Sequence, residues 1–190
     1  MRILIYGATE IGYNVAYHLC NDHDITILAD KERLPERFGC LDIGFVSGSG
    51  SDIEILEQID AGKMDLFIAC SDRDEANIVA CWTVKRTGDV ETACFVGTNE
   101  LFNNLERYHQ KRYRTPYDVD MVVWPERLLT EEIFRIVSVP EAIDVKYFAK
   151  GRAKLFEYRI KEGSAILDKK ICDCAFPVNV LIVGIIREDK

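Results

Sequence analysis

The chain has 190 residues, of which 48% are apolar and 29% charged, and its formal net charge at pH 7 is −8. This composition predicts a globular protein with one domain and room for a small second unit. The acidic balance argues against nucleic-acid binding, whose affinity comes mostly from neutralising phosphates, and no apolar run reaches the roughly 18 residues of a membrane-spanning helix.

The seven cysteines are scattered along the chain, which is typical of a protein in a reducing compartment. Only Cys172 and Cys174 lie close together, and no histidine or second pair accompanies them as a zinc site would require. We therefore expect a cytoplasmic protein that does not insert into the membrane and holds no metal.

The first part of the chain alternates short apolar runs with segments of helical spacing. The apolar runs predict strands at residues 2–6, 24–28, 43–46, 64–70, 91–96 and 119–123. The segments between them predict helices at residues 11–20, 51–59, 74–86 and 100–112. Such alternation implies right-handed crossovers and a parallel sheet covered on both faces. The predicted fold class is α/β, a Rossmann-like doubly wound sheet.

A further helix is predicted from Pro125 to Ser138, with proline at its first position and acidic residues in its early turns. Its apolar residues form a wide stripe, which predicts burial against both its own sheet and a partner. Beyond it the pattern changes to strands at residues 143–148, 154–160 and 178–186. We place a domain boundary near residue 139, between a Rossmann-type domain (1–138) and a small, incomplete α+β subdomain (139–190).

The first strand leads into a glycine turn, GATEIG, that differs from the dinucleotide-binding pattern G-x-G-x-x-G at one position. Gly7 allows the tight turn, and Gly12 lets the following helix pack closely, with its free N–H groups directed at a phosphate. Thr9 occupies the position where glycine lets the backbone approach a pyrophosphate, although its hydroxyl could donate to a phosphate oxygen instead. The candidate phosphate-binding residues are Gly7, Ala8, Thr9, Glu10, Ile11 and Gly12.

Two further turns are expected at the same edge of the sheet. Asp30 stands at or one step after the end of the second strand, where an acidic residue binds the ribose 2′-hydroxyl, and Lys31 follows it. The turn beginning Gly48-Ser49 comes after the third strand. The competing interpretation is a Rossmann turn that no longer binds nucleotide.

Four blocks in this order resemble the regulator-of-conductance-of-potassium family (RCK or KTN domains), in particular the cytosolic subunit of Trk/Ktr-type bacterial potassium uptake systems. The blocks are RILIYGATEIGYNVAYHL with HDITILADKERL, then MDLFIACSDRDEANIVACWTVKRTG, DMVVWPERLLTEEIFRIVSVPEAIDV and LFEYRIKEGSAILDKKICDCAFPVNVLIVGIIRED. The chain is thus similar to a TrkA-N domain followed by part of a TrkA-C domain.

The resemblance implies a regulator and no enzymatic activity. Such domains bind NAD(H), or ATP and ADP, in the Rossmann crevice. They form homodimers through the crossover helix, here Pro125–Ser138, assemble into higher rings and gate a membrane-embedded potassium channel or transporter subunit. Besides the glycine turn and Asp30, the residues that match the family's binding site are Ser71, Asp72 and Asn77, and those that match its pairing helix are Pro125, Glu126, Leu129 and Phe134.

Several positions depart from the family pattern, which usually has Gly-Asp-Ala/Thr after the third strand and an arginine after the fifth. Here those segments read Gly48-Ser49-Gly50 and Cys94–Thr98, while Thr9 and Ala29 replace a glycine and the ribose acid. We therefore predict weakened or altered nucleotide binding. The alternatives are an NAD-dependent oxidoreductase, for which no Tyr-x-x-x-Lys pair is present, a ligand-free assembly domain, and a domain that senses a cation through the acidic turn.

Overall fold

The computed structural model describes residues 1–110, 117–138, 142–148, 153–177 and 179–187. The chain divides into two compact units, Met1–Glu131 and Glu132–Lys190. The division falls inside helix α5 (Pro125–Ser138), which the sequence analysis assigned whole to the first domain.

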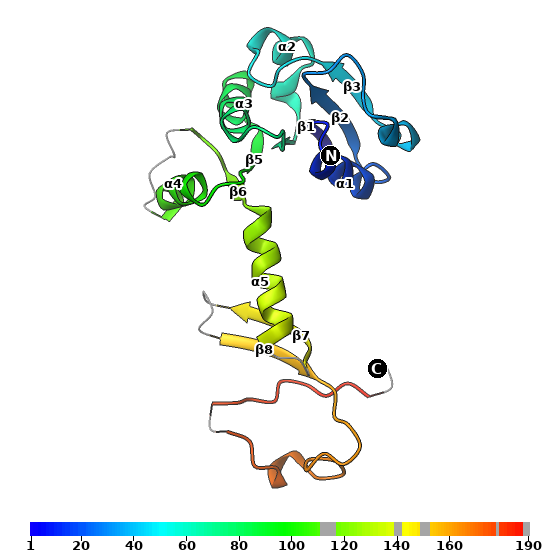
Figure 1. The fold of residues 1–190 in the computed structure, drawn as a ribbon, viewed down its shortest axis with the longest axis vertical. Coiled ribbons are helices and arrows are strands. Elements are labelled where there is room, and N and C mark those ends of the chain that lie inside the picture. Colours follow the sequence, from blue (N-terminus) through cyan, green and yellow to red (C-terminus); the bar gives the residue numbers. More distant parts are fainter. Residues whose placement is uncertain (111–116, 139–141, 149–152, 178, 188–190) are drawn as a thin grey trace. The chain divides into compact units, whose positions relative to one another are not determined.

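The first unit is built on a six-stranded sheet with the order β3-β2-β1-β4-β5-β6 (Figure 1). All five neighbouring pairs are parallel. This topology confirms the predicted doubly wound α/β fold, since sequential strands extend first to one side of β1 and then to the other. The strands are β1 (Arg2–Tyr6), β2 (Asp24–Ala29), β3 (Gly44–Ser47), β4 (Leu66–Ala69), β5 (Glu91–Phe95) and β6 (Met121–Val123).

Helices cover both faces of this sheet because successive strand residues point to opposite sides. On β1, Ile3 and Ile5 pack in one core with Ala16, whereas Leu4 packs in the other core with Leu56 and Val84. Helix α1 therefore covers one face, and α2, α3 and α4 cover the other. The helices are α1 (Glu10–Leu19), α2 (Ile53–Gln58), α3 (Asp74–Thr87) and α4 (Asn99–Gln110), with short 3-10 turns at Glu36–Cys40 and Ala61–Lys63.

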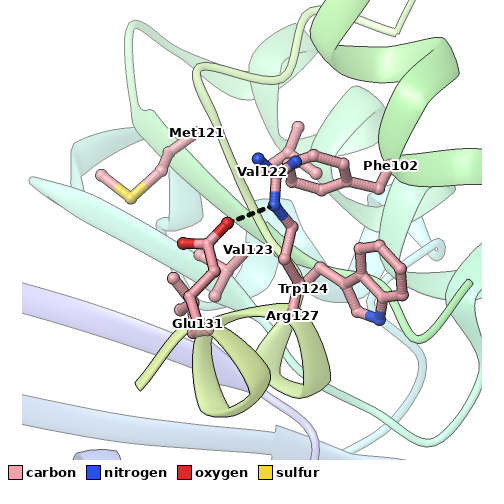
Figure 2. A pocket seen from close by; sticks show the side chains of 8 residues that line it. Phe102, Met121, Val122, Val123, Trp124, Arg127 and Glu131 are labelled. Carbon is pink, nitrogen blue, oxygen red and sulfur yellow. Dashed lines mark hydrogen bonds and ion pairs between the residues drawn. The ribbon is translucent and has the colours of Figure 1, made fainter. Parts of the chain in front are cut away.

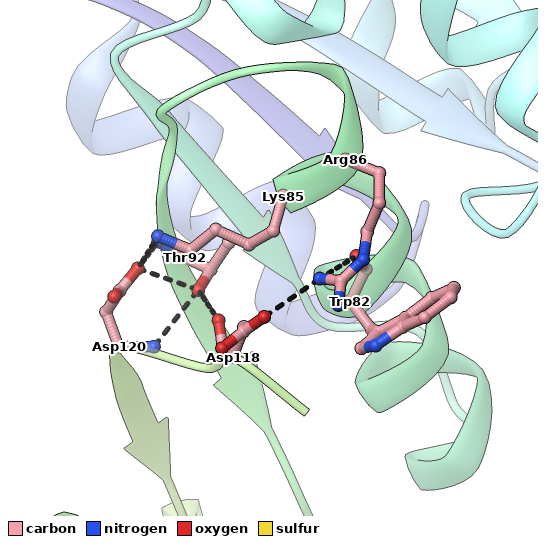
Figure 3. A network of polar contacts seen from close by, with 6 residues as sticks. All are labelled: Trp82, Lys85, Arg86, Thr92, Asp118 and Asp120. Atoms are coloured by element: carbon pink, nitrogen blue, oxygen red, sulfur yellow. Dashed lines mark hydrogen bonds and ion pairs between the residues drawn. The ribbon is translucent and has the colours of Figure 1, made fainter. Parts of the chain in front are cut away.

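A polar network fastens the start of β6 to β5 and to the end of α3 (Figure 3). The Asp120 carboxylate accepts from the Thr92 N–H at 2.8 Å and pairs with the Lys85 ammonium at 2.6 Å. Beside it, Arg86 donates to Asp118 at 2.9 Å. Burial raises the pKa of Asp120, but the hydrogen bonds from Lys85 and Thr92 outweigh that effect and leave the pKa lowered.

The second unit contains one antiparallel pair, β7 (Ala142–Phe148) with β8 (Ala153–Tyr158), and a 3-10 turn at Ile171–Asp173. The strand predicted at residues 178–186 is wrong over its described part. Residues 179–186 form no strand, and Leu181 is 82% exposed. A strand needs a neighbouring edge for its N–H and C=O groups, and within the described part of this unit only β7 and β8 pair. Val178 lies outside the described residues.

Among the described residues, no helix combines the length and the apolar character needed to cross a membrane.

Candidate functional site

The candidate site lies where the carboxyl ends of the central strands meet. Because the strands are parallel, the turns after β1, β2, β3 and β4 share one edge of the sheet. The strand order reverses between β1 and β4, and ligands of open α/β sheets bind in the crevice beside such a reversal. The topology therefore brings the predicted turns together.

Gly7 and Gly12 allow two close approaches at this edge. Gly7 has a φ of +126°, and a Cβ there would lie 2.6 Å from the Ser71 nitrogen. A Cβ on Gly12 would collide with the Gly7 carbonyl oxygen. The structural roles predicted for both glycines, a tight turn and close helix packing, are confirmed.

Thr9 is the N-cap of α1 and has an ordinary extended φ of −92°. Its hydroxyl accepts from the Gly12 N–H at 3.2 Å and donates its proton to the Cys70 carbonyl at 2.8 Å. Its only proton is thus directed at the Cys70 carbonyl, and donation to a phosphate would require this bond to break. The N–H groups of Glu10 and Ile11 belong to the first turn of the helix and have no intrahelical acceptor. They are directed outward from the N-terminus of α1, where helices bind anions.

An arginine approaches the same helix start from the connection between β2 and β3. The Arg37 guanidinium forms an ion pair with Glu10 and lies 5.5 Å from the ring centroid of Tyr13. Sequence reasoning missed this residue, since 27 residues separate it from its partner. The arginine that the family pattern expects after β5 is absent, and Arg37 brings a cation to α1 from another direction.

Asp30 follows β2 directly and is exposed. Its Oδ2 accepts a hydrogen bond from the Tyr6 hydroxyl at 2.9 Å. Tyr6 is the last residue of β1 and is 3% exposed. Burial and the Asp30 carboxylate raise the pKa of Tyr6, while hydrogen bonds from the Ser49 hydroxyl and the Gly50 N–H partly oppose the rise. The only sequence signal for Tyr6 was a polar aromatic residue directly before the glycine turn.

The turn after β3 is joined to the end of β2. The Gly48 N–H donates to the Ala29 carbonyl at 2.9 Å, and Gly48 has a φ of +156°. Ser49 follows, with its hydroxyl 3.0 Å from that of Ser51. Lys31 is exposed, and its N–H also donates to Ala29. The structure thus gathers Asp30, Gly48 and Ser49 at one point, as the sequence predicted.

Asn77 connects the turns after β4 and β5. Its Oδ1 accepts from the N–H and the hydroxyl of Ser71 at 2.8 and 2.6 Å. Its Nδ2 donates to the carbonyls of Ser71 and Phe95, both at 3.0 Å. Asn77 is 1% exposed, so its side chain shapes the crevice and has no unused donor to offer a ligand.

The acidic turn after β4 also includes Asp72 and Asp74. Asp74 accepts the Gly97 N–H at 2.9 Å, which holds the turn after β5 against the start of α3, and Asp72 is exposed. Within the described part of the chain, no group of three or more His, Cys, Asp and Glu side chains is placed to hold a metal ion.

A second surface lies at the start of α5 (Figure 2). A hollow of about 330 Å³ is bordered by Arg127, whose Nε donates to Glu131 at 2.8 Å and whose guanidinium lies 4.9 Å from the Phe102 ring centroid. Leu129 and Phe134 on α5, which match the family's pairing helix, are 61% and 63% exposed in the single chain. The remaining lining residues are Met121, Val122, Val123, Trp124 and Leu128.

Comparisons with known proteins show the family and the fold of the chain. Residues 3–109 match the TrkA-N domain. The chain is 31% identical over 187 residues to a Trk system potassium uptake protein TrkA homolog of Archaeoglobus fulgidus, covering 98% of this chain and 42% of that protein. It is 30% identical over 197 residues to Trk system potassium uptake protein trkA homolog 1 of Methanosarcina mazei, covering 100% of this chain and 47% of that protein.

Among solved structures, a GsuK channel bound to NAD is similar with a TM-score of 0.59 and 17% sequence identity, covering 77% of this chain and 25% of that chain. This likeness concerns the fold. The chain spans less than half the length of the two TrkA relatives that it matches.

Proposed function

Because the chain belongs to the TrkA-N domain family, we propose that it is the cytoplasmic regulatory part of a potassium uptake system, acting on a membrane-embedded channel or transporter subunit. The proposal is supported by two relatives that are named as potassium uptake proteins and match 98% and 100% of this chain. The observation that carries the ligand-binding part is the glycine turn at the start of α1, next to the strand-order reversal.

The ligand of the regulator is an adenine nucleotide, NAD(H) or ATP and ADP. Its phosphates lie against the N–H groups of Glu10 and Ile11, close to Arg37, and its ribose lies at Asp30. Ala8 and Ser71 border the phosphates, and Asn77 acts by holding the turns in place. Without an arginine after β5, a charge-assisted hydrogen bond worth roughly 1.5–3 kcal/mol is missing, so binding is weaker than in a site with that arginine.

The nucleotide regulates by favouring one arrangement of the assembly over another. A ligand shifts such an equilibrium only by the difference between its affinities for the two arrangements. This chemistry needs no general acid or base. No observation favours the oxidoreductase alternative.

The assembly is a homodimer formed through α5, from which higher rings are built. Five large apolar side chains of this helix are more than half exposed in the single chain, which supports a partner that covers them. They are Leu128, Leu129, Ile133, Phe134 and Val137.

Thermal unfolding with millimolar NAD, NADH, ATP or ADP tests the ligand proposal. A nucleotide present at 100 times its dissociation constant adds about 2.7 kcal/mol to the free energy of unfolding, so at least one should raise the midpoint. Asp30→Ala should reduce the shift, whereas Asp22→Ala, which alters an exposed carboxylate between α1 and β2, should preserve it. If all four nucleotides leave the midpoint unchanged, nucleotide sensing is rejected.

A further inference from the structure

We propose that Tyr6, Gly50 and Asp30 form a rebuilt ribose subsite, in which Tyr6 is a positioning residue that holds the Asp30 carboxylate toward the 2′- and 3′-hydroxyls of the nucleotide. The inference rests on the proposed nucleotide binding and adds the residue that orders the ribose-binding carboxylate. As in other dinucleotide-binding sites, a carboxylate at this place favours nucleotides with a free ribose diol over those with a 2′-phosphate.

The first support is steric. The Tyr6 ring leaves β1 on the side covered by α2 and α3, and it fills the space above Gly50. A Cβ on Gly50 would lie 2.7 Å from Cγ of Tyr6 and 2.9 Å from Cβ of Ala80. Such distances do not occur in proteins, so the buried tyrosine requires glycine at position 50. The turn after β3, which departs from the family pattern, therefore fits the tyrosine at the end of β1.

The second support is the placement of the carboxylate. The residue at the strand end, Ala29, is buried and offers no polar group, and the acid stands one position later. An exposed aspartate in a turn would ordinarily sample several rotamers, and ordering it on ligand binding would reduce the affinity. The Tyr6 hydroxyl, itself ordered by burial, donates to Oδ2 at 2.9 Å and fixes the carboxylate before the ligand arrives.

The third support is hydrogen-bonding capacity. An ionised carboxylate has about four lone-pair sites, and Tyr6 uses one of them. The sites that remain suffice for two ribose hydroxyls, which are donors. A 2′-phosphate brings only acceptors and negative charge to the same position, so the carboxylate disfavours it. Gly50 leaves space for Tyr6, and Tyr6 holds Asp30, which takes the place of the acid that is missing at Ala29. The site is therefore selective for nucleotides with a free ribose diol.

Calorimetric titration of the full chain with ADP and 2′-deoxy-ADP tests the positioning role, because ADP is contained in all the candidate ligands. Wild type should bind ADP about tenfold more tightly than 2′-deoxy-ADP, as expected for loss of a hydrogen bond to a charged group. Tyr6→Phe, which keeps the ring, and Asp30→Asn should each reduce this preference to about twofold. The double variant should show no further reduction, and adenosine 2′,5′-bisphosphate should not compete.

Tyr17→Phe is the matched control, since it removes a hydroxyl from an exposed tyrosine of α1 and should leave the preference at its wild-type value. If wild type binds ADP and Tyr6→Phe retains the full preference, the positioning role is overturned while nucleotide binding stands. If wild type binds no nucleotide in either assay, both proposals are overturned. Thermal midpoints of the variants separate a loss of folding from a change in preference.

Discussion

Thr9 shows how one residue can replace the middle glycine of a phosphate turn. The backbone at this position is extended, with a φ of −92°, and therefore does not need glycine. The side chain instead links the start of α1 to the end of the neighbouring strand through Gly12 and Cys70. Burial raises the pKa of the Cys70 thiol to about 12, against a smaller opposing effect of the Thr9 hydroxyl, so this cysteine stays protonated beneath the turn.

Replacing Thr9 by alanine removes the cap and the bond to the Cys70 carbonyl together. We expect Thr9→Ala to lower the free energy of unfolding by about 1–2 kcal/mol, the usual effect of losing a side-chain N-cap. Thr9→Ser keeps the hydroxyl and should remain within about 0.5 kcal/mol of wild type. Urea unfolding of the two variants measures the difference, and equal losses for alanine and serine would show that the hydroxyl does not stabilise the fold.

Side chains at both ends of helix α3 hold neighbouring turns and segments of the sheet in place. At its start, Asp74 and Asn77 hold the turns after β4 and β5, which border the candidate site. At its end, Lys85 and Arg86 hold the segment that leads into β6 (Figure 3). Because β6 has only three residues, side-chain bonds at this end contribute to keeping it in the sheet.

The charge at Asp120 makes this contribution dependent on pH. Its pKa is lower in the folded chain than the ordinary value of 3.8, so ionised Asp120 stabilises the fold above that pH, and the stabilisation disappears as the pH falls through the folded pKa. Asp120→Asn should therefore be less stable than wild type at pH 7, and the gap should narrow below about pH 4. Urea midpoints between pH 7 and pH 3 measure it, with Asp22→Asn as a control for an exposed carboxylate. A gap that does not change with pH would contradict the role of the charge.

For the molecule as a whole, the main feature is the exposure of large apolar side chains on α5. The first unit encloses its core between the sheet and the four preceding helices, yet α5 presents large apolar residues to solvent in the single chain. The hollow beside Arg127 adds an apolar surface at the start of the same helix (Figure 2). Exposure on this scale is typical of a protein–protein contact.

Sedimentation equilibrium tests the proposed dimer. Wild type should sediment as a dimer or a larger assembly, and the double variant Leu129→Ser/Phe134→Ser should shift toward the monomer, because it removes apolar area from the proposed contact. Leu181→Ser, a change of the same kind at an exposed leucine outside α5, should leave the assembly intact. A monomeric wild type, or a double variant that associates as wild type does, would reject pairing through α5.

The sequence by itself determined the α/β fold class, the positions of most strands and helices, and the structural roles of Gly7 and Gly12. These follow from local patterns, namely the alternation of apolar runs with helical segments and a turn that only glycine allows. The resemblance to one family could likewise be recognised from the order of its blocks.

Only the tertiary structure decided which polar groups are free for a ligand. Thr9 and Asn77 donate hydrogen bonds to the carbonyls of Cys70 and Phe95, at the ends of strands distant in sequence. Asp30, in contrast, accepts a hydrogen bond from Tyr6 and stays exposed. The same reason explains the missing strand at residues 179–186, since apolar character is local but a strand forms only where a neighbouring edge accepts it. Hydrogen-bond partners are set by the packing of distant segments, and no local pattern in the sequence specifies them.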